Sequence, residues 1–488
     1  MLRRRPRHPV RAALLCILFL AAVWVGWFVS YRISAEPVPE WDSVERLNEL
    51  VASRQPEEEN AWPIYKRILI HELGYESFPS MRGNDLYDEL GTLSSGQNEH
   101  FRITGDWNDP MWEEYRARFE RLRHLLTLLD EAAAAPGFAY PYGDYDSGDE
   151  SILGPPGILL PELGAFRFLA RLNTIGLRAA AAGGDWDEVV QRLRTGLGMA
   201  RHLTYQATMI EWIVGRGIAT ELLTELQRAL MENDVPSIHC EEALAALSEA
   251  TWPAIPISNA LDGERLFIQS MLQWLYTPGQ RGFLHYRSIH DLGLERALDP
   301  LDTDLYHQPV FNRIVNLHPK MIMTPRREAS ERIIEEVWVE IDAHLWRERL
   351  GLDSLNSLIL DRTENADVPR FLLEYVARPL YNFFLCKTMH RSASVMLRLE
   401  AHHARTGEWP DSLLDAMSPD DATDPVTGLQ FRYDRVFEDP HGRPYLLRAP
   451  DSYPYTPQVE GWPVLNQPRP PIPDWMHDEG TGGSGSSP

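Results

Sequence analysis

The chain has few cysteines and lacks the motifs that identify the common enzyme classes. Three cysteines in 488 residues exclude a disulfide framework. Cys16 lies in an apolar run, so Cys240 and Cys386 remain, either to pair with each other or to be buried as small hydrophobic residues. There is no P-loop, no HExxH, no CxxC pair and no GxSxG on a strand-to-helix turn. The sequence therefore predicts no cofactor and no catalytic residue.

Basic residues are scarce outside the first 35 positions. That stretch holds six arginines and no acidic residue, so the remaining 41 basic and 71 acidic side chains leave a net charge of −30 on the rest of the chain. Such an acidic body repels polyanions and lacks the basic surface that nucleic-acid binding requires. The composition excludes a nucleic-acid partner.

An uncharged apolar run occupies 12–29, directly after a basic arm at 1–11. At about 1.5 Å per residue it approaches the thickness of a bilayer's hydrocarbon core. Because arginines precede the run, the positive-inside rule predicts a cytoplasmic N-terminus with the bulk of the chain on the other side. The alternative is a cleavable signal peptide, with Ser34-Ala35 as the cleavage site. We favour one uncleaved transmembrane helix, since the run is long for a signal peptide and carries two tryptophans near its end.

Apolar residues recur at three- and four-residue steps, which predicts a mainly α fold. A helical domain is expected over 40–370. Within it, an αα-hairpin is predicted near 161–203, where two glycines separate the helices and Asp185 and Glu188 form a capping box. By contrast, the Gly-, Pro- and Asp-rich stretch 137–160 predicts a surface loop.

The stretch 285–307 has no helical periodicity and concentrates histidine and aspartate. Imidazole and carboxylate groups are ligands of zinc and manganese, so this stretch is the candidate site of a metal-dependent hydrolase. Loops also gather such residues because they face water. The hydrolase is therefore the alternative function. The candidate metal ligands are His285, His290, Asp302, Asp304 and His307.

Two helical patterns have structural explanations. Glu400 and His403 have the Glu-x-x-His spacing of di-iron bundles, but no second copy exists, which favours a polar helix end. Gly215-Arg216-Gly217 begins like a dinucleotide fingerprint but lies inside a helical pattern. Helix packing through small residues explains it better.

Turn residues interrupt the pattern near the C-terminus. A last long helix, with Pro379 either at its start or at a kink, runs into a Gly-x-Trp-Pro turn. An Asp-Pro-Val-Thr-Gly turn and alternating apolar residues follow, which predict two strands. This layout resembles the C-terminal part of the major pseudopilin of bacterial type II secretion. The residues that carry the resemblance are Gly407, Trp409, Pro410, Asp424, Pro425, Gly428 and Tyr433.

The resemblance implies a long helix plus a small antiparallel sheet over 371–465, before a disordered Pro/Gly/Ser tail at 466–488. After Asp451, SYPYTPQ replaces the acidic segment that binds calcium in pseudopilins, which counts against a calcium site. Arg11 leads directly into an apolar run without glutamate, so assembly as a pilin is not expected. The wider layout is similar to uncharacterised single-span bacterial envelope proteins, and this similarity implies a location but no reaction.

We therefore expect a single-pass protein of the bacterial inner membrane, anchored by 12–29, with its bulk in the periplasm. A non-enzymatic role is favoured, in which the helical domain binds an envelope protein or peptide, or serves as a scaffold.

Overall fold

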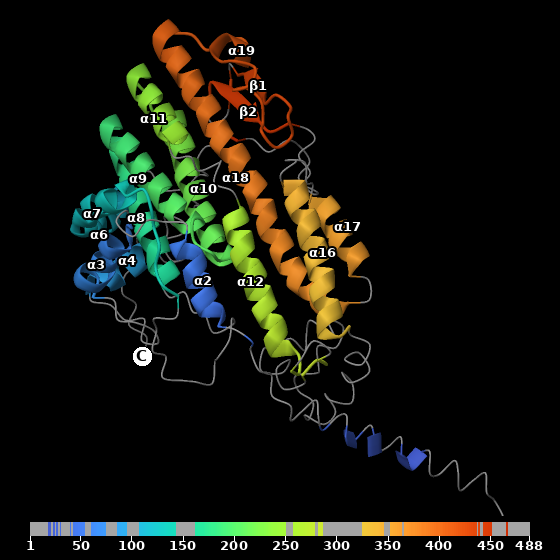
Figure 1. The fold of residues 1–488 in the computed structure, drawn as a ribbon. Coiled ribbons are helices and arrows are strands. Elements are labelled where there is room, and N and C mark those ends of the chain that lie inside the picture. Colours follow the sequence, from blue (N-terminus) through green and yellow to red (C-terminus); the bar gives the residue numbers. More distant parts are fainter. Residues whose placement is uncertain are drawn as a thin grey trace, which may run out of the picture.

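The computed structural model shows a mainly helical protein with one small sheet (Figure 1). The structure describes residues 18–20, 23–24, 26–27, 30, 40, 42–53, 60–74, 85–94, 107–142, 162–249, 257–278, 282–285, 325–345, 352–363, 366–436, 438–439, 443–450 and 465–466. The predicted mainly α fold is confirmed.

The first half of the chain contributes short helices and then long ones. The short elements are α2 (Ser43–Ala52), α3 (Trp62–Arg67) with the π-helical turn η2 (Ile68–Glu72), α4 (Asp85–Ser94), the 3₁₀ turn η4 (Pro110–Trp112), α6 (Glu113–Leu122) and α7 (His124–Ala134). The longer ones are α8 (Glu162–Gly183), α9 (Trp186–Thr204), α10 (Met209–Glu232), α11 (Ser237–Glu249) and α12 (Ser258–Leu275).

The second half contains α16 (Arg327–Leu345), α17 (Leu352–Arg362), α18 (Asp367–Thr406), α19 (Leu413–Ala416), β1 (Arg432–Arg435) and β2 (Tyr445–Arg448). Helix α18 is continuous through Pro379, so the helix does not begin at this proline. With 40 residues it is roughly 60 Å long. It packs on α10 and α11 along one part and on α16 and α17 along another (Figure 1).

The predicted αα-hairpin is formed by α8 and α9. Gly184 has a φ of +72° at the turn, and the Asp185 carboxylate caps α9 by accepting from the Glu188 amide at 3.2 Å. The reciprocal half of the predicted capping box is absent, because the Glu188 carboxylate pairs with Arg192 at 2.9 Å. The Glu188 side chain thus forms an ion pair one turn further along α9 and does not accept from the Asp185 amide.

Close helix packing through glycine is confirmed where α10 crosses α9. A Cβ atom at Gly215 would lie 2.7 Å from the Ala200 carbonyl oxygen, which is closer than real contacts allow. Glycine is therefore needed at this crossing, whereas a Cβ at Gly217 would meet nothing within 4 Å.

Helix α18 connects two hydrophobic cores. The larger core joins α2–α11 to the C-terminal half of α18 and to the sheet, and it includes Leu399 and Leu447. The smaller core gathers α12, α16 and α17 around the start of α18 at Leu373. Cys240 and Cys386 are buried and not bonded to each other, as small hydrophobic residues would be.

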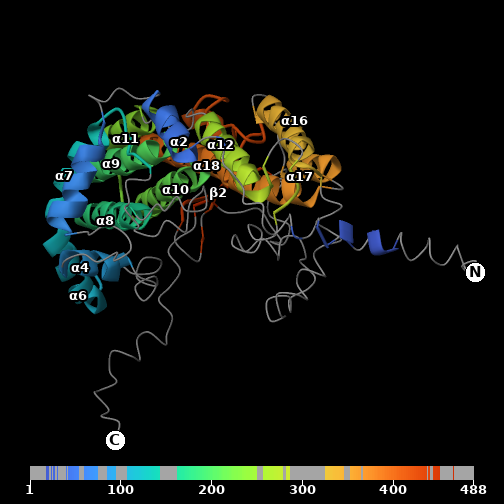
Figure 2. The same cartoon turned by 60° about the horizontal axis from the view of Figure 1, so that its bottom comes forward.

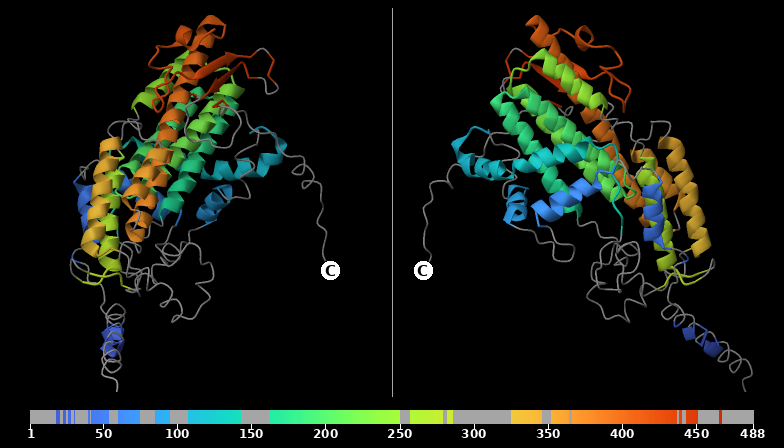
Figure 3. Two further views of the ribbon diagram at one scale, coloured as in Figure 1. Left: turned by 90° about the vertical axis from the view of Figure 1, so that its right-hand side faces the viewer. Right: turned by 60° about the vertical axis from the view of Figure 1, so that its left-hand side comes forward.

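The predicted strands pair as a two-stranded antiparallel sheet at the end of α18, with Arg432 opposite Arg448 and Arg435 opposite Tyr445 (Figure 3). Tyr445 is fully buried. The Asn466 side chain donates to the Tyr445 carbonyl at 2.7 Å and is itself buried. The disordered tail predicted from 466 is therefore wrong at its first residue, and 467–488 lies outside the described residues.

Most of the apolar run 12–29 lies outside the described residues. The residues of this run that the structure describes are helical. Across the described part of the chain, no helix has both the length and the apolar character needed to cross a bilayer. In Figure 2 the short blue pieces near the label N lie apart from the helical body.

Candidate functional site

An extended segment at 135–142 passes through the larger core. Phe138 is fully buried, and Tyr140 and Tyr142 are nearly so, which makes the predicted surface loop wrong over 137–142. Residues 143–160 of that prediction lie outside the described part of the structure. Local composition indicated a loop because it carries no information on the side chains that surround the segment.

Two asparagines hydrogen-bond the segment as a neighbouring strand would. Asn60 accepts from the Ala139 amide at 2.9 Å and donates to the Ala139 carbonyl at 2.6 Å. Asn48 pairs with Tyr142 in the same way, at 2.7 and 3.0 Å. Buried backbone groups need such partners, so these amides allow an irregular segment to lie inside a helical core.

His202 holds the start of the segment and is neutral. Its Nε2 donates to the Ala135 carbonyl at 2.8 Å, and its Nδ1 lies 3.1 Å from the Tyr65 hydroxyl. A carbonyl only accepts, so Nε2 carries the proton and Nδ1 accepts from Tyr65. Burial lowers the pKa of His202 to about 3. The ring stacks on Phe138 with centroids 5.6 Å apart, so this histidine positions the segment and does not exchange protons near neutrality.

The segment presents two tyrosines to Glu211, in the first turn of α10. One oxygen of this carboxylate, Oε2, accepts from the Tyr142 hydroxyl at 2.6 Å, the Thr208 hydroxyl at 2.7 Å and the Thr208 amide at 3.1 Å. Thr208 and Glu211 thereby form a reciprocal capping box. The Tyr142 hydroxyl also accepts from the Ala207 amide at 3.0 Å. The orientation of Glu211 is thus fixed by donors on one oxygen.

A second buried carboxyl group, Glu162, begins α8 beside Glu211. Burial raises the pKa of each to about 7, and the two groups also interact electrostatically. Tyr140 interacts with the same Glu211 carboxylate. We call Glu162, Glu211, Tyr140 and Tyr142 the buried carboxyl cluster. Its raised pKa values and its position between α8, α10 and the 135–142 segment make it the principal candidate site.

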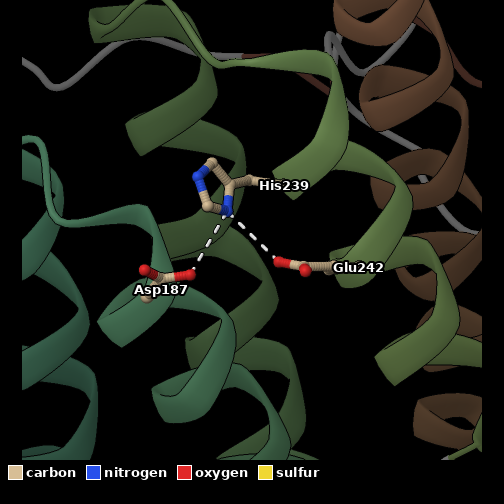
Figure 4. Close-up of side chains that lie close together, drawn as sticks. All are labelled: Asp187, His239 and Glu242. Carbon is tan, nitrogen blue, oxygen red and sulfur yellow. Dashed lines mark hydrogen bonds and ion pairs between the residues drawn. The ribbon is translucent and has the colours of Figure 1, made fainter.

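An exposed group of possible metal ligands joins α9 to α11 (Figure 4). The Nδ1 atom of His239 lies 3.2 Å from Glu242 Oε2 and 3.7 Å from Asp187 Oδ1, within ligand distance of a common ion. The side chain of Asp187 is 88 % exposed. Asp187 lies in the first turn of α9, where an acidic residue complements the positive end of the helix dipole. This preference, together with the hydrogen bond between His239 and Glu242, accounts for the three side chains without a metal ion.

The sequence-predicted metal ligands fall mostly outside the described residues. His285 is buried, and its amide donates to the Leu275 carbonyl at 2.7 Å beside α12. The described residues do not include His290, Asp302, Asp304 or His307, so the metal-dependent hydrolase stays a prediction.

The residues of the Gly-x-Trp-Pro turn form the junction between α18 and the sheet. Gly407 has a φ of +76° and ends α18 with its amide donating to His403 at 2.8 Å. The Trp409 ring stacks on the His403 ring, with centroids 4.3 Å apart. The Tyr433 hydroxyl donates to the Pro410 carbonyl at 2.9 Å. His403 is therefore part of the packing of this junction.

Asp424 holds the second turn against α18. Its fully buried carboxylate accepts from the Thr388 hydroxyl at 2.7 Å and from the Thr427 hydroxyl at 2.8 Å. Gly428, with a φ of +70°, donates its amide to the Asp424 carbonyl at 2.9 Å. Pro425 starts the turn between them. These residues are structural in this chain.

The sequence analysis predicted neither the buried carboxyl cluster nor the exposed group of Asp187, His239 and Glu242. In the sequence, Glu211 looks like an ordinary helix-capping glutamate, and its partners Tyr140 and Tyr142 lie in a stretch that was predicted to be a surface loop. The Thr-x-x-Glu pattern at 208–211 was a readable signal for the cap but not for the tyrosines. Comparison of the chain with protein-family models, curated proteins and solved structures finds no match.

Proposed function

We propose that this chain is a membrane-anchored binding or scaffold protein of the bacterial envelope, with a cytoplasmic N-terminus and a periplasmic body. The supporting observation is the exposure of the apolar side chains that the structure describes within 12–29. They are between 52 and 68 % exposed, and they are Leu18, Phe19, Leu20, Val23, Trp24 and Trp27.

Exposure of six large apolar side chains in one run is unfavourable in water. Each gains roughly 1.5–3 kcal/mol when it leaves water, so insertion of the six into a bilayer is worth on the order of 10 kcal/mol. The arginines at 3, 4, 5, 7 and 11 precede them, which favours retention of the N-terminus in the cytoplasm.

A binding role for the body is supported by the burial and hydrogen bonding of its interior polar side chains. His202 is neutral and hydrogen-bonded on both nitrogens, and Glu211 is fully buried. The long helices of the body, packed side by side, give it extended faces suited to a protein or peptide partner. We also propose that α18 with β1 and β2 is a pseudopilin-like end, because the helix, the glycine turn and the antiparallel pair follow in that order.

Membrane attachment is tested by alkaline extraction of membranes and by protease treatment of spheroplasts. We expect the chain to resist extraction and its body to be digested. A matched pair of variants sharpens the test. Leu20→Arg should release a fraction of the chain, because a charge in the span costs about 3 kcal/mol. Ile70→Arg, at a position 44 % exposed on the body, should not. Full extraction of the parent chain contradicts anchoring.

The binding role is tested separately, by cross-linking in intact cells followed by purification in detergent. A partner protein or peptide should be recovered in a fixed ratio to the chain. Recovery of the chain alone, at several cross-linker lengths, contradicts a binding role and leaves the anchoring result unaffected.

A further inference from the structure

The residues around Glu40 fix the position at which the chain joins the helical body. The Glu40 amide donates to the side-chain oxygen of Gln273, a residue of α12 that is 2 % exposed. The Glu40 carboxylate pairs with the guanidinium of Arg327, at the start of α16, at 2.9 Å. The Arg327 side chain is 8 % exposed and pairs with Glu331 at 2.8 Å as well. Glu40 is therefore held by two helices that are distant from it in the sequence.

The partners of Glu40 belong to one closely packed end of the smaller core. The Arg327 amide donates to the Gly282 carbonyl at 3.2 Å. The hydroxyl of the buried Tyr276 lies 2.8 Å from the Ser330 hydroxyl, which joins the end of α12 to the start of α16. We call the last turn of α12, the described residues of 276–285 and the first turn of α16 the α12–α16 end.

The chain that follows Glu40 is fixed to the same helix. Asp42 caps α2 with its carboxylate, which accepts from the Val44 amide at 2.8 Å. Helix α2 then packs against α12, the helix that supplies Gln273. Because both contacts involve α12, the body cannot turn freely about the chain at Glu40. The orientation of the body is therefore set by the direction from which the chain reaches this residue.

The length of chain before Glu40 limits its distance from a membrane. Residues 30–39 separate Glu40 from the apolar run 12–29. An extended chain spans at most about 3.5 Å per residue, so Glu40 lies within roughly 40 Å of a bilayer that holds the run. Helix α18, roughly 60 Å long, begins in the smaller core and ends at the sheet (Figure 1). The linker thus keeps the α12–α16 end near the bilayer and places no such limit on the sheet.

We propose that the α12–α16 end is the surface of the body that faces the lipid headgroups, and that Glu40 holds the body to its anchor in this orientation. The proposal rests on the membrane anchoring proposed above. Arg326, at this end, is exposed, and its guanidinium lies 4.9 Å from the centre of the Phe283 ring. A positive charge at this surface is attracted by lipid phosphates. The sheet and α19 lie at the other end of α18 and point away from the membrane (Figure 3).

The test places one fluorescent label at each end of the body, in the full chain reconstituted into phospholipid vesicles. Every variant carries Cys16→Ser, and Cys240 and Cys386 are buried. Glu328→Cys provides a label in the first turn of α16, and Ala404→Cys provides one near the end of α18, both at exposed positions. Flotation of the vesicles first measures attachment of the chain. A nitroxide on the lipid headgroup then quenches a label that lies close to the bilayer.

We expect the label at position 328 to be quenched several-fold more strongly than the label at position 404. Glu40→Ala should reduce this difference, because it removes the ion pair between the chain and Arg327. Glu45→Ala, which makes the same change at an exposed position of α2, should leave the difference as it is. Thermal unfolding of both variants verifies that the body remains folded.

The outcomes separate orientation from anchoring. A chain that does not float with the vesicles contradicts anchoring, and the proposal falls with it. A chain that floats with equal quenching at the two positions, or with stronger quenching at 404, overturns the orientation alone. Weak quenching at both positions overturns it too, since the α12–α16 end would then meet a second copy or another protein instead of lipid. A difference that Glu40→Ala leaves unchanged overturns the role of Glu40.

Discussion

Replacement of Glu211 by glutamine should make the body less sensitive to pH. Burial raises the pKa of Glu211 from 4.5 to about 7. The folded chain therefore keeps a proton that the unfolded chain has lost, and this stabilisation disappears as pH rises through 7. One pKa unit corresponds to about 1.4 kcal/mol, so the stability that depends on this proton is about 3 kcal/mol. Between pH 5.5 and 8 it should change by about 2 kcal/mol.

The glutamine variant fits the same hydrogen bonds. Its carbonyl oxygen can accept from the Tyr142 and Thr208 hydroxyls, as Oε2 of Glu211 does. Its stability carries no contribution from titration at this position. Histidine acts in the opposite direction, because the pKa of His202 is lowered to about 3 and its protonation in the unfolded chain removes stability below pH 6.5. That effect is common to both proteins and cancels in their difference.

The assay is urea unfolding of the parent chain and Glu211→Gln in chelator, followed by far-ultraviolet circular dichroism from pH 5.5 to 8. Only the difference in unfolding free energy matters. We expect the parent to lose about 2 kcal/mol relative to the variant as pH rises. A difference that stays constant to within about 0.5 kcal/mol, or that grows with the opposite sign, refutes the reasoning about this carboxyl group.

Three further substitutions test the packing of α10. Glu225→Ala should destabilise the body by about 3–5 kcal/mol in urea unfolding, because it removes the carboxylate that accepts from the buried Arg178 guanidinium at 2.9 and 2.8 Å. A loss below 1 kcal/mol would contradict this. Gly215→Ala should destabilise, since its Cβ would meet the Ala200 carbonyl, whereas Gly217→Ala should stabilise by up to about 1 kcal/mol in thermal unfolding. Equal shifts for the two glycines would contradict the close helix crossing.

The helices were predictable because their apolar residues repeat at the helical period, which is a local property. The hairpin of α8 and α9 follows from Gly184 and Asp185, which end one helix and cap the next within a few residues. The end of α18 at Gly407 and the antiparallel strands beyond it were readable for the same reason.

The buried segment at 137–142 was not predictable from its own residues. Its Gly, Pro and Tyr content is typical of loops, and its burial depends on Asn48, Asn60 and Gln206, which are distant in the chain. A backbone segment can leave water only where such partners are already in place. Sequence periodicity contains no record of those partners.

The sequence by itself determined the elements of this protein: an apolar run after a basic arm, a series of amphipathic helices, and a helix-to-strand end. Only the tertiary structure decided the chemistry of the interior. Glu162, Glu211 and Tyr140 lie on three separate elements, and each alone resembles an ordinary surface or capping residue. Their raised pKa values arise from removal of water and from proximity, and both causes are properties of the packed fold.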